Sequence, residues 1–294
     1  MLIDFKNHLQ AKGFDSNYFY RIKPFLTFCE ENKIDYYNIK LSELNQFLLY
    51  LRTKKLQNGT INNFINALRN FYKFLSDNKF VGQKVINIIY KIKLVKYERK
   101  IKDYITEEEL SDLIEMGISF CNNIQPIKIQ AILYFLFYTG LRKNEILNLK
   151  RKDIDLKEKT VIVRIPTKNK VERIVFFPEK VNNPKVNNPK KDNKIIPITT
   201  ILYSYFESEP EEKNAFNITS GKLSYLIHNL KAFVPNKNLT IHTFRHSFAR
   251  MLASKQIDSR IAQKLLGHKN IESTMIYYDP DIDVIKKIYN EKIR

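Results

Sequence analysis

Residues 60–75, TINNFINALRNFYKFL, carry large apolar side chains at spacings of three and four residues. Because an α-helix turns once in about 3.6 residues, this spacing predicts a helix with one broad apolar face. A helix this apolar on one side needs packing partners, so the neighbouring segments should supply further helices. The predicted face consists of Ile61, Phe64, Ile65, Leu68, Phe71, Tyr72 and Leu75.

The preceding residues repeat the pattern in two shorter segments. Residues 16–32 and 42–51 both place apolar side chains on one side, and Ser42 is the expected N-cap of the second helix. Several amphipathic helices with short connections predict a small helical bundle over residues 1–95. The apolar positions are Tyr20, Phe25 and Phe28 in the first segment, and Leu44, Phe47, Leu48 and Leu51 in the second.

A second domain is expected to begin at Thr106, which forms a capping-box pattern with Glu109. The apolar run 127–138 predicts a buried helix, since it is too short to cross a membrane. Residues 160–165 and 173–177 are rich in β-branched side chains and predict a β-hairpin. The predicted fold class is therefore mainly α, with an N-terminal helical domain and a mostly helical C-terminal domain that contains a small β-hairpin.

The predicted boundaries are a helical domain over 1–95, a linker over 96–105 and a second domain over 106–294. The linker falls in KIKLVKYERKIKD, residues 91–103, which contains six basic side chains and is expected to follow a DNA backbone. The tandem repeat VNNPKVNNPK at 181–190 predicts a polar surface excursion, to which we assign no function.

Charge points to a polyanionic partner. The 294 residues carry a formal net charge of +19, of which +10 lies in residues 1–100 and +9 in the remainder. Because both parts are basic, we expect both to contact nucleic acid. Cys29 and Cys121 suggest neither a disulfide framework nor a thiolate metal site. The sequence shows no signal peptide and no apolar run of about 18 residues, so we expect a cytoplasmic protein with no membrane partner.

Three short patterns carry candidate chemistry. They are TGLRKNE at 139–145, HTFRH at 242–246, and LLGH at 265–268 followed nine residues later by Tyr277. Each is ordinary by itself, because an arginine at a helix start or a His-x-x-Arg pair usually belongs to a solvated helix face. Their order, spacing and small-residue context together point to a single site.

Taken together, these patterns resemble the tyrosine recombinase, or phage integrase, family, in its Xer-like form, over nearly the whole chain. That family's active site reads Arg, Lys, His-x-x-Arg, His or Trp, then Tyr. Lys168 lies five residues before Arg173 in TKNKVER, with Lys170 as the alternative, and Tyr278 is the alternative nucleophile. Carried over motif by motif, the catalytic residues are Arg142, Lys168, His242, Arg245, His268 and Tyr277.

The resemblance implies a chemistry that these residue types can perform. Arg142 and Arg245 would clamp a pentacoordinate phosphorane formed when Tyr277 attacks a DNA phosphate. The two histidines would donate hydrogen bonds or move the tyrosine proton, and Lys168 would protonate the leaving oxygen. Since the phosphotyrosine keeps the phosphodiester energy, rejoining needs no ATP, and no Gly-x-x-x-x-Gly-Lys-Ser loop is present. The sequence also shows no clustered carboxylates typical of a two-metal nuclease, so we expect no cofactor and no metal. Glu145 either orients Arg142 or forms an ordinary surface pair.

The resemblance further implies a SAM-like core-binding domain, a catalytic domain and a C-terminal tail, residues 283–294, that docks into a neighbouring protomer. The expected partner is a double-stranded DNA recombination site, bound by a homo-tetramer on two DNA sites or a hetero-tetramer with a second recombinase. The expected role is Xer-like dimer resolution, or integration and excision of a compact mobile element. A type IB topoisomerase-like enzyme and a catalytically inactive DNA-binding relative are the alternatives.

Overall fold

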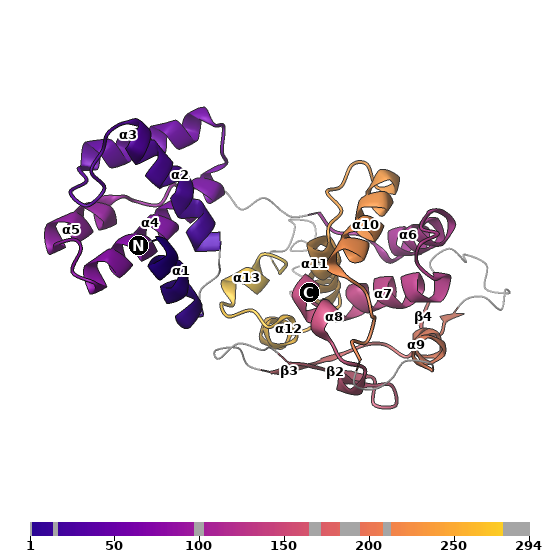
Figure 1. Ribbon diagram of the computed structural model, residues 1–294. Helices are drawn as coiled ribbons and strands as arrows, with labels where there is room; N and C mark the ends of the chain where they lie inside the picture. Colours follow the sequence, from indigo (N-terminus) through magenta and orange to yellow (C-terminus); the bar gives the residue numbers. More distant parts are fainter. Residues whose placement is uncertain are drawn as a thin grey trace, which may run out of the picture. The chain divides into compact units, whose positions relative to one another are not determined.

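The computed structural model describes residues 2–13, 17–96, 103–164, 172–182, 195–207 and 213–278. Backbone contacts divide the chain into two compact units, residues 1–100 (unit 1) and 101–294 (unit 2). Figure 1 draws unit 1 in indigo and purple, and unit 2 in colours from magenta to yellow. The C-terminal tail expected to dock into a neighbour lies outside the described residues.

Unit 1 is a bundle of helices centred on the one predicted from residues 60–75. Its helices are α1 (Leu2–Ala11), α2 (Asn17–Glu31), α3 (Leu41–Thr53), α4 (Asn58–Asp77) and α5 (Gln83–Lys91). Helix α4 packs against α1, α2 and α5. Every predicted position of its apolar face is buried except Phe64, which is half-buried. Edge-on aromatic pairs fill this core, with ring centroids 5.1 Å apart in Phe5–Phe71 and in Phe25–Phe47. The predicted helical bundle is confirmed.

The start of α3 differs from its prediction. The helix begins at Leu41 with Lys40 as N-cap, so Ser42 lies inside the first turn. The backbone N–H of Lys40 donates to Oε2 of Glu43 at 2.7 Å. Glu43, at the third helical position, thus accepts a hydrogen bond from a backbone N–H at the helix start, so a hydroxyl cap at residue 42 is not required.

The chain that leaves α5 stays attached to α4. The Asn62 side chain donates to the carbonyl of Val95 at 2.9 Å and accepts from its N–H at 2.8 Å, and Arg69 Nη2 donates to the carbonyl of Ile92 at 2.7 Å. The backbone that precedes the predicted linker is therefore held in place, while residues 97–102 lie outside the described residues. The exposed lysines on this held segment are Lys91, Lys93 and Lys96.

Unit 2 is built around the buried helix α7 (Pro126–Thr139), which packs against α6 (Glu107–Phe120), α9 (Ile198–Phe206) and α11 (Ile241–Ser254). The apolar run 127–138 predicted this buried helix. The helices that the structure describes are α6 (Glu107–Phe120), α7 (Pro126–Thr139), α8 (Lys143–Asn148), α9 (Ile198–Phe206), α10 (Ser220–Leu230), α11 (Ile241–Ser254), α12 (Ser259–Leu266) and α13 (Glu272–Met275), with 3₁₀ turns at Arg151–Asp153 and Lys231–Phe233.

The helix start predicted at Thr106 is present. The backbone N–H of Thr106 donates to Oε2 of Glu109 at 2.8 Å, and its hydroxyl accepts from the Glu109 N–H at 3.2 Å. This reciprocal capping box begins α6 at Glu107, the first helix after the linker.

The strands are β1 (Ile154–Asp155), β2 (Thr160–Val163) and β3 (Arg173–Phe176), with a second pair formed by β4 (Val181–Asn182) and β5 (Ile195–Ile196). The first three form a small antiparallel sheet in the order β1-β2-β3, with Val161 opposite Val175. Strand β3 packs against α12 (Figure 1). The predicted hairpin is thus confirmed. Its turn, residues 165–171, lies outside the described residues, as do residues 183–194 with most of the tandem repeat.

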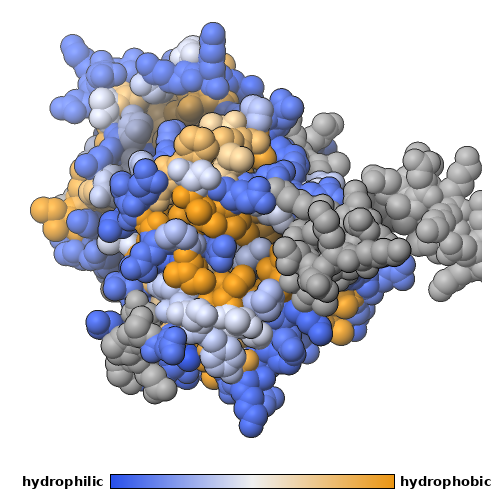
Figure 2. Space-filling model, turned by 90° about the vertical axis from the view of Figure 1, so that its right-hand side faces the viewer, coloured by the Kyte–Doolittle hydropathy of each residue, from blue (hydrophilic) through white to orange (hydrophobic). Residues whose placement is uncertain are grey.

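The surface of the molecule mixes polar and apolar side chains. Figure 2 looks onto the side that lies at the right of Figure 1, and it shows apolar residues gathered among hydrophilic ones. No helix in the described ranges is both long and apolar enough to span a membrane. The architecture is the mainly α fold with small sheets that the sequence predicts.

Candidate active site

A tight turn between α7 and α8 sets the position of Arg142. Gly140 ends α7 in the left-handed conformation, with φ of 60°. Residues with a side chain adopt this conformation at a cost. A Cβ at this position would also lie 2.4 Å from Cδ1 of Phe248 on α11, which is closer than real contacts allow. The glycine therefore lets α7 and α11 approach and places Arg142 at the N-cap of α8.

Arg245 ties this turn to the end of α12. It lies on α11 and is buried, with 5% of its surface exposed. Its Nη1 donates to the carbonyl of Gly140 at 2.7 Å, and its Nη2 donates to the carbonyl of Leu266. Burial, together with the charges of Arg142 and Arg173, lowers the pKa of Arg245 to about 9. The guanidinium consequently stays protonated at neutral pH.

Arg142 bonds to the same two regions and keeps part of its guanidinium accessible. Its Nη1 donates to Oε1 of Glu145 at 2.8 Å, and its Nη2 donates to the carbonyl of Gly267 at 2.8 Å. The side chain remains 34% exposed. It can therefore approach an anionic ligand without first leaving its partners.

Arg173, the first residue of β3, makes the most extensive contacts in the cluster. Its Nη1 and Nη2 donate to the two carboxylate oxygens of Glu145 at 2.9 and 2.8 Å, and its Nε donates to the carbonyl of Leu265 at 2.9 Å. Both side chains of this ion pair are 8% exposed. Burial would raise the pKa of Glu145, but the hydrogen bonds and charge of Arg173, with the hydrogen bonds from Arg142, lower it to about 2.

These contacts produce a local excess of positive charge. Within the described ranges, the carboxylate of Glu145 is bonded to the guanidiniums of Arg142 and Arg173, and the charge of a third guanidinium, that of Arg245, acts on the same group. Because that carboxylate is ionised at neutral pH, the cluster carries a net charge of +2. Such a site favours an anion, above all one whose charge grows during a reaction. Glu145 is enclosed and contacts Arg142 directly, so it is no ordinary surface pair.

His268 follows Gly267, the left-handed C-cap of α12 with φ of 62°. Its Nδ1 forms a hydrogen bond of 2.8 Å with the hydroxyl of Thr274. Burial, followed by the charges of the nearby arginines, lowers the pKa of His268 to about 4. The ring is therefore neutral at pH 7 and acts as a fixed hydrogen-bonding group.

Tyr277 lies in the turn after α13, half-buried against side chains of α11 and α12. Its hydroxyl forms a hydrogen bond with Nδ1 of His246. Burial raises the pKa of Tyr277, and the positive charge of Arg245 opposes that rise. The hydroxyl of Tyr278, in contrast, is buried without a hydrogen-bond partner in the described structure. The charge of Arg245 thus acts on Tyr277, the predicted nucleophile.

The structure brings most of the predicted residues together. Arg142, Arg245 and His268 meet around the carbonyls of Leu266 and Gly267. His242 is exposed on the first turn of α11, and its ring centroid lies 6.5 Å from that of His246. Lys168 and its alternative Lys170 fall outside the described residues.

Two residues of the cluster were not predicted to take part in the site. Arg173 served only as a landmark for Lys168, and His246 only as part of the HTFRH pattern. The available signals were an arginine at the start of a predicted strand and a histidine adjacent to a predicted catalytic arginine. Neither signal indicates which residue the side chain contacts, because the contacts join positions far apart in the chain.

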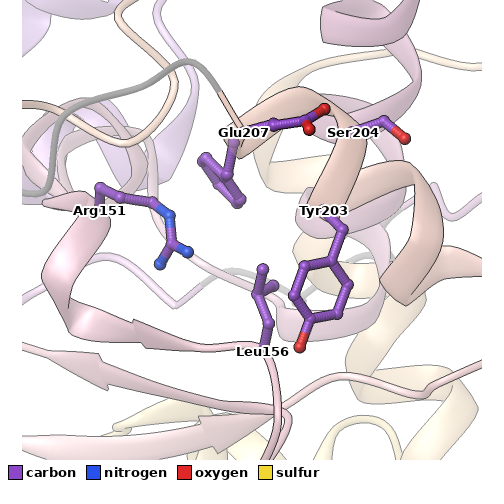
Figure 3. A pocket seen from close by; sticks show the side chains of 6 residues that line it. Arg151, Leu156, Tyr203, Ser204 and Glu207 are labelled. Carbon is purple, nitrogen blue, oxygen red and sulfur yellow. The ribbon is translucent and has the colours of Figure 1, made fainter.

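A separate shallow pocket shares no residue with this cluster (Figure 3). Its lining residues include Arg151, Leu156, Tyr203 and Glu207, which surround the opening in the close-up view. The Arg151 guanidinium lies 4.8 Å from the ring centroid of Phe206. That stacking accounts for the arginine as a packing residue.

Sequence comparisons cover both units. Residues 103–283 match the phage integrase family, and residues 8–80 match the N-terminal SAM-like domain of phage integrases. The tyrosine recombinase XerC of Bacillus licheniformis is 30% identical over 258 residues, which are 86% of this chain and 80% of the relative.

Solved structures share the fold. The Tn1549 transposon integrase, in complex with a circular intermediate DNA, has a TM-score of 0.68 at 16% identity, covering 99% of this chain and 98% of that one. The XerH site-specific recombinase bound to difH substrate has a TM-score of 0.63 at 21% identity, and the match covers 92% of this chain and 77% of that one. With its two family matches and the XerC relative, the chain belongs to the phage integrase family, the tyrosine recombinases.

Proposed function

We propose that this recombinase cuts and rejoins DNA at a specific site through a 3′-phosphotyrosine formed on Tyr277. The observation that carries the proposal is the positively charged cluster beside that tyrosine. In the described part of the site, three guanidiniums lie near one carboxylate, which is bonded to two of them, and the charge of Arg245 acts on the tyrosine hydroxyl. A phosphodiester gains negative charge as it is attacked, so it would be bound most strongly in the transition state.

Arg142 and Arg245 are the proposed clamps on the non-bridging phosphate oxygens. Both are held by backbone carbonyls or by Glu145, so little rearrangement is needed when the phosphate arrives. Donors organised in this way are commonly worth about 3–4 kcal/mol each. Neutral His268, with Nδ1 bonded to Thr274, would donate from Nε2 to the same phosphate. His242 is the remaining proposed hydrogen-bond donor.

The leaving group needs a proton. Breaking the P–O5′ bond produces an alkoxide, a poor leaving group unless it is protonated. Lys168 is the proposed acid because it lies five residues before Arg173 in the sequence. Arg173 is the first residue of β3, and its side chain is bonded to Glu145 and to the Leu265 carbonyl within the proposed phosphate site. The chemistry proposed for these residues requires no metal and no nucleotide cofactor.

The proposed partner is a double-stranded recombination site. The charge of +10 in residues 1–100 suits contacts from unit 1 to the DNA backbone, and the cluster in unit 2 suits the scissile phosphate. We infer assembly as a homo-tetramer on two DNA sites, or as a hetero-tetramer with a second recombinase. In either assembly the tail 283–294 would dock into a neighbouring protomer.

The biological role that we favour is Xer-like resolution of chromosome or plasmid dimers, which would support chromosome partition in the cytoplasm. The XerC relative supports this role, while the transposon integrase supports integration and excision of a mobile element. Type IB topoisomerase-like activity differs in a measurable way, because a lone protomer would relax supercoiled DNA. An inactive DNA-binding relative would form no covalent adduct.

A nicked suicide substrate tests the proposal. Cleavage next to the nick releases a short strand, so the covalent protein–DNA adduct accumulates and the held strand can be sequenced. We expect an adduct in excess EDTA with the wild type and with Tyr278→Phe, and none with Tyr277→Phe. An adduct that forms only with Mg²⁺, or that persists in Tyr277→Phe, would refute the mechanism.

A further inference from the structure

The tyrosine nucleophile must lose a proton, and the contacts around it select one histidine to receive that proton. We propose that His246 is the general base that takes the Tyr277 proton during cleavage and returns it during rejoining. This inference rests on the proposed phosphotyrosine chemistry and adds a catalytic residue to it.

The first argument is contact. Nδ1 of His246 is hydrogen-bonded to Oη of Tyr277, and the two ring centroids lie 5.7 Å apart at an interplanar angle of 33°. A general base must be within hydrogen-bond reach of the proton it removes. The neutral tautomer with its proton on Nε2 presents the Nδ1 lone pair to the hydroxyl. Both residues are half-buried, so the proton does not have to be released directly to bulk water.

The second argument comes from the other two histidines of the site. Nδ1 of His268 is bonded to Thr274, and burial with the nearby arginines lowers the pKa of His268 to about 4. That imidazole is a poor proton acceptor at neutral pH. His242 is exposed one helical turn before His246. Within the described part of the site, it is His246 that is hydrogen-bonded to the tyrosine hydroxyl.

The third argument is the environment of the hydroxyl. Burial raises the pKa of Tyr277, so a neutral phenol is the resting form and attack needs a base. The charge of Arg245 opposes that rise and would stabilise the phenolate as it forms. Among the described residues, titratable groups that interact with His246 include Tyr277 from the turn after α13, His242 on α11 and His268 after α12.

The proton balance is complete in both directions. In cleavage, the Oη–P bond forms, the P–O5′ bond breaks, and the phenol proton moves to His246 Nδ1. The leaving O5′ takes a proton from Lys168, the proposed acid. In rejoining, a 5′ hydroxyl attacks phosphorus, its proton returns to the lysine, and the departing Tyr277 oxygen recovers its proton from His246.

The test is single-turnover cleavage of the suicide substrate across pH. His246→Asn is the main variant, because its side-chain oxygen can accept the tyrosine hydrogen bond near the Nδ1 position but cannot take up the proton. His246→Gln is the second variant, and His228→Asn is the matched control, because His228 is an exposed residue of α10 that contributes nothing to the described site. Thermal unfolding and half-site binding establish which variants fold.

We expect the wild-type rate to rise with pH and then level off, because only the neutral imidazole accepts a proton. His246→Asn should cleave about 10²–10³-fold more slowly and should lose the rising limb of the pH–rate profile, with half-site binding unchanged. A rate and pH limb like those of the wild type in a folded His246 variant would overturn the inference. A slow variant that keeps the limb would also overturn it, since His246 would then only position the tyrosine. Absence of any adduct in the wild type and in His228→Asn would instead refute the recombinase chemistry itself.

Discussion

The carboxylate of Glu145 accepts hydrogen bonds from both terminal nitrogens of Arg173, at 2.9 and 2.8 Å, although 28 residues separate the two in the chain. The same carboxylate accepts from the guanidinium and the backbone N–H of Arg142. One enclosed side chain therefore connects the strand that follows the lysine hairpin to the arginine that begins α8. Its removal should disturb both.

Glu145→Gln should destabilise unit 2 by about 3–5 kcal/mol, because it leaves an enclosed guanidinium without its counter-ion. Cleavage of the suicide substrate should fall by at least about 100-fold in the fraction that remains folded, since Arg142 loses its orientation. Denaturant unfolding and adduct yield measure the two effects. Glu158→Gln removes an exposed carboxylate and should change stability by less than about 0.5 kcal/mol. A Glu145 variant as stable as this control would contradict the prediction.

His268 should make the protein less stable as pH falls from about 6.5 to about 4. The unfolded ring binds a proton near pH 6.5, whereas burial and the arginines hold the folded pKa to about 4. Within that window the unfolded state binds more protons, so the free energy of unfolding rises with pH. The pKa shift limits the resulting loss in the free energy of unfolding to about 3 kcal/mol at most. Because the ring is partly exposed and solvent screens its charge, we expect a loss of about 1 kcal/mol.

The measurement is urea unfolding at several pH values in this window. His268→Asn does not titrate, so the difference between wild type and variant isolates this ring from the carboxylates that also titrate there. His228→Asn should follow the wild-type profile. Parallel profiles for the wild type and His268→Asn would show that the ring titrates normally in the folded state.

The lysines next to the linker should contribute to DNA affinity through phosphate neutralisation. Asn62 and Arg69 hold the backbone of this segment on α4, so its exposed lysines extend from a fixed surface. Replacing Lys91, Lys93 and Lys96 by Gln should flatten the log–log salt dependence of binding by up to about three units, at about 0.9 per phosphate contact. The triple Arg variant keeps the charge and should keep the slope. An unchanged slope in the triple Gln variant would place the segment away from DNA.

The leaving-group acid can be identified by chemical rescue. A 5′-bridging phosphorothiolate carries sulfur at the leaving position, and sulfur departs without protonation. Lys168→Ala should therefore cleave normal DNA very slowly and the phosphorothiolate almost as fast as the wild type. Lys170→Ala serves as the comparison and should cleave both substrates well. Rescue confined to Lys170→Ala would move the role two residues along the hairpin.

Local patterns predicted the elements, while the network between them depended on contacts that no local pattern encodes. The spacing of Ile61, Ile65 and Leu68 was enough to predict α4, because burial of a helix face repeats along the sequence. The ion pair of Glu145 with Arg173 joins two separate elements, so it produces no repeating pattern in the sequence. The start of α3 was placed wrongly, because Glu43 satisfies it without the expected Ser42 cap.

The same limit applied within the site. The family resemblance identified Arg245, but its hydrogen-bond acceptors are the backbone carbonyls of Gly140 and Leu266. Every residue has such a carbonyl, so the sequence gives no sign of which ones accept. His246 was visible only as a neighbour of Arg245. Its bond to Tyr277 depends on how the turn after α13 folds back onto α11.

Because backbone atoms at the ends of α7 and α12 hold Arg245, its position is insensitive to most side-chain changes at residue 266. Many apolar residues at that position would present the same oxygen, provided that the helix ends where it does. Apolar substitutions of similar size at residue 266 can therefore occur without moving the guanidinium. The points of vulnerability are the two left-handed glycines, Gly140 and Gly267, which determine where those helices stop. Random mutagenesis with selection for recombination should accordingly recover apolar substitutions at the buried Leu266 more often than any substitution at either glycine.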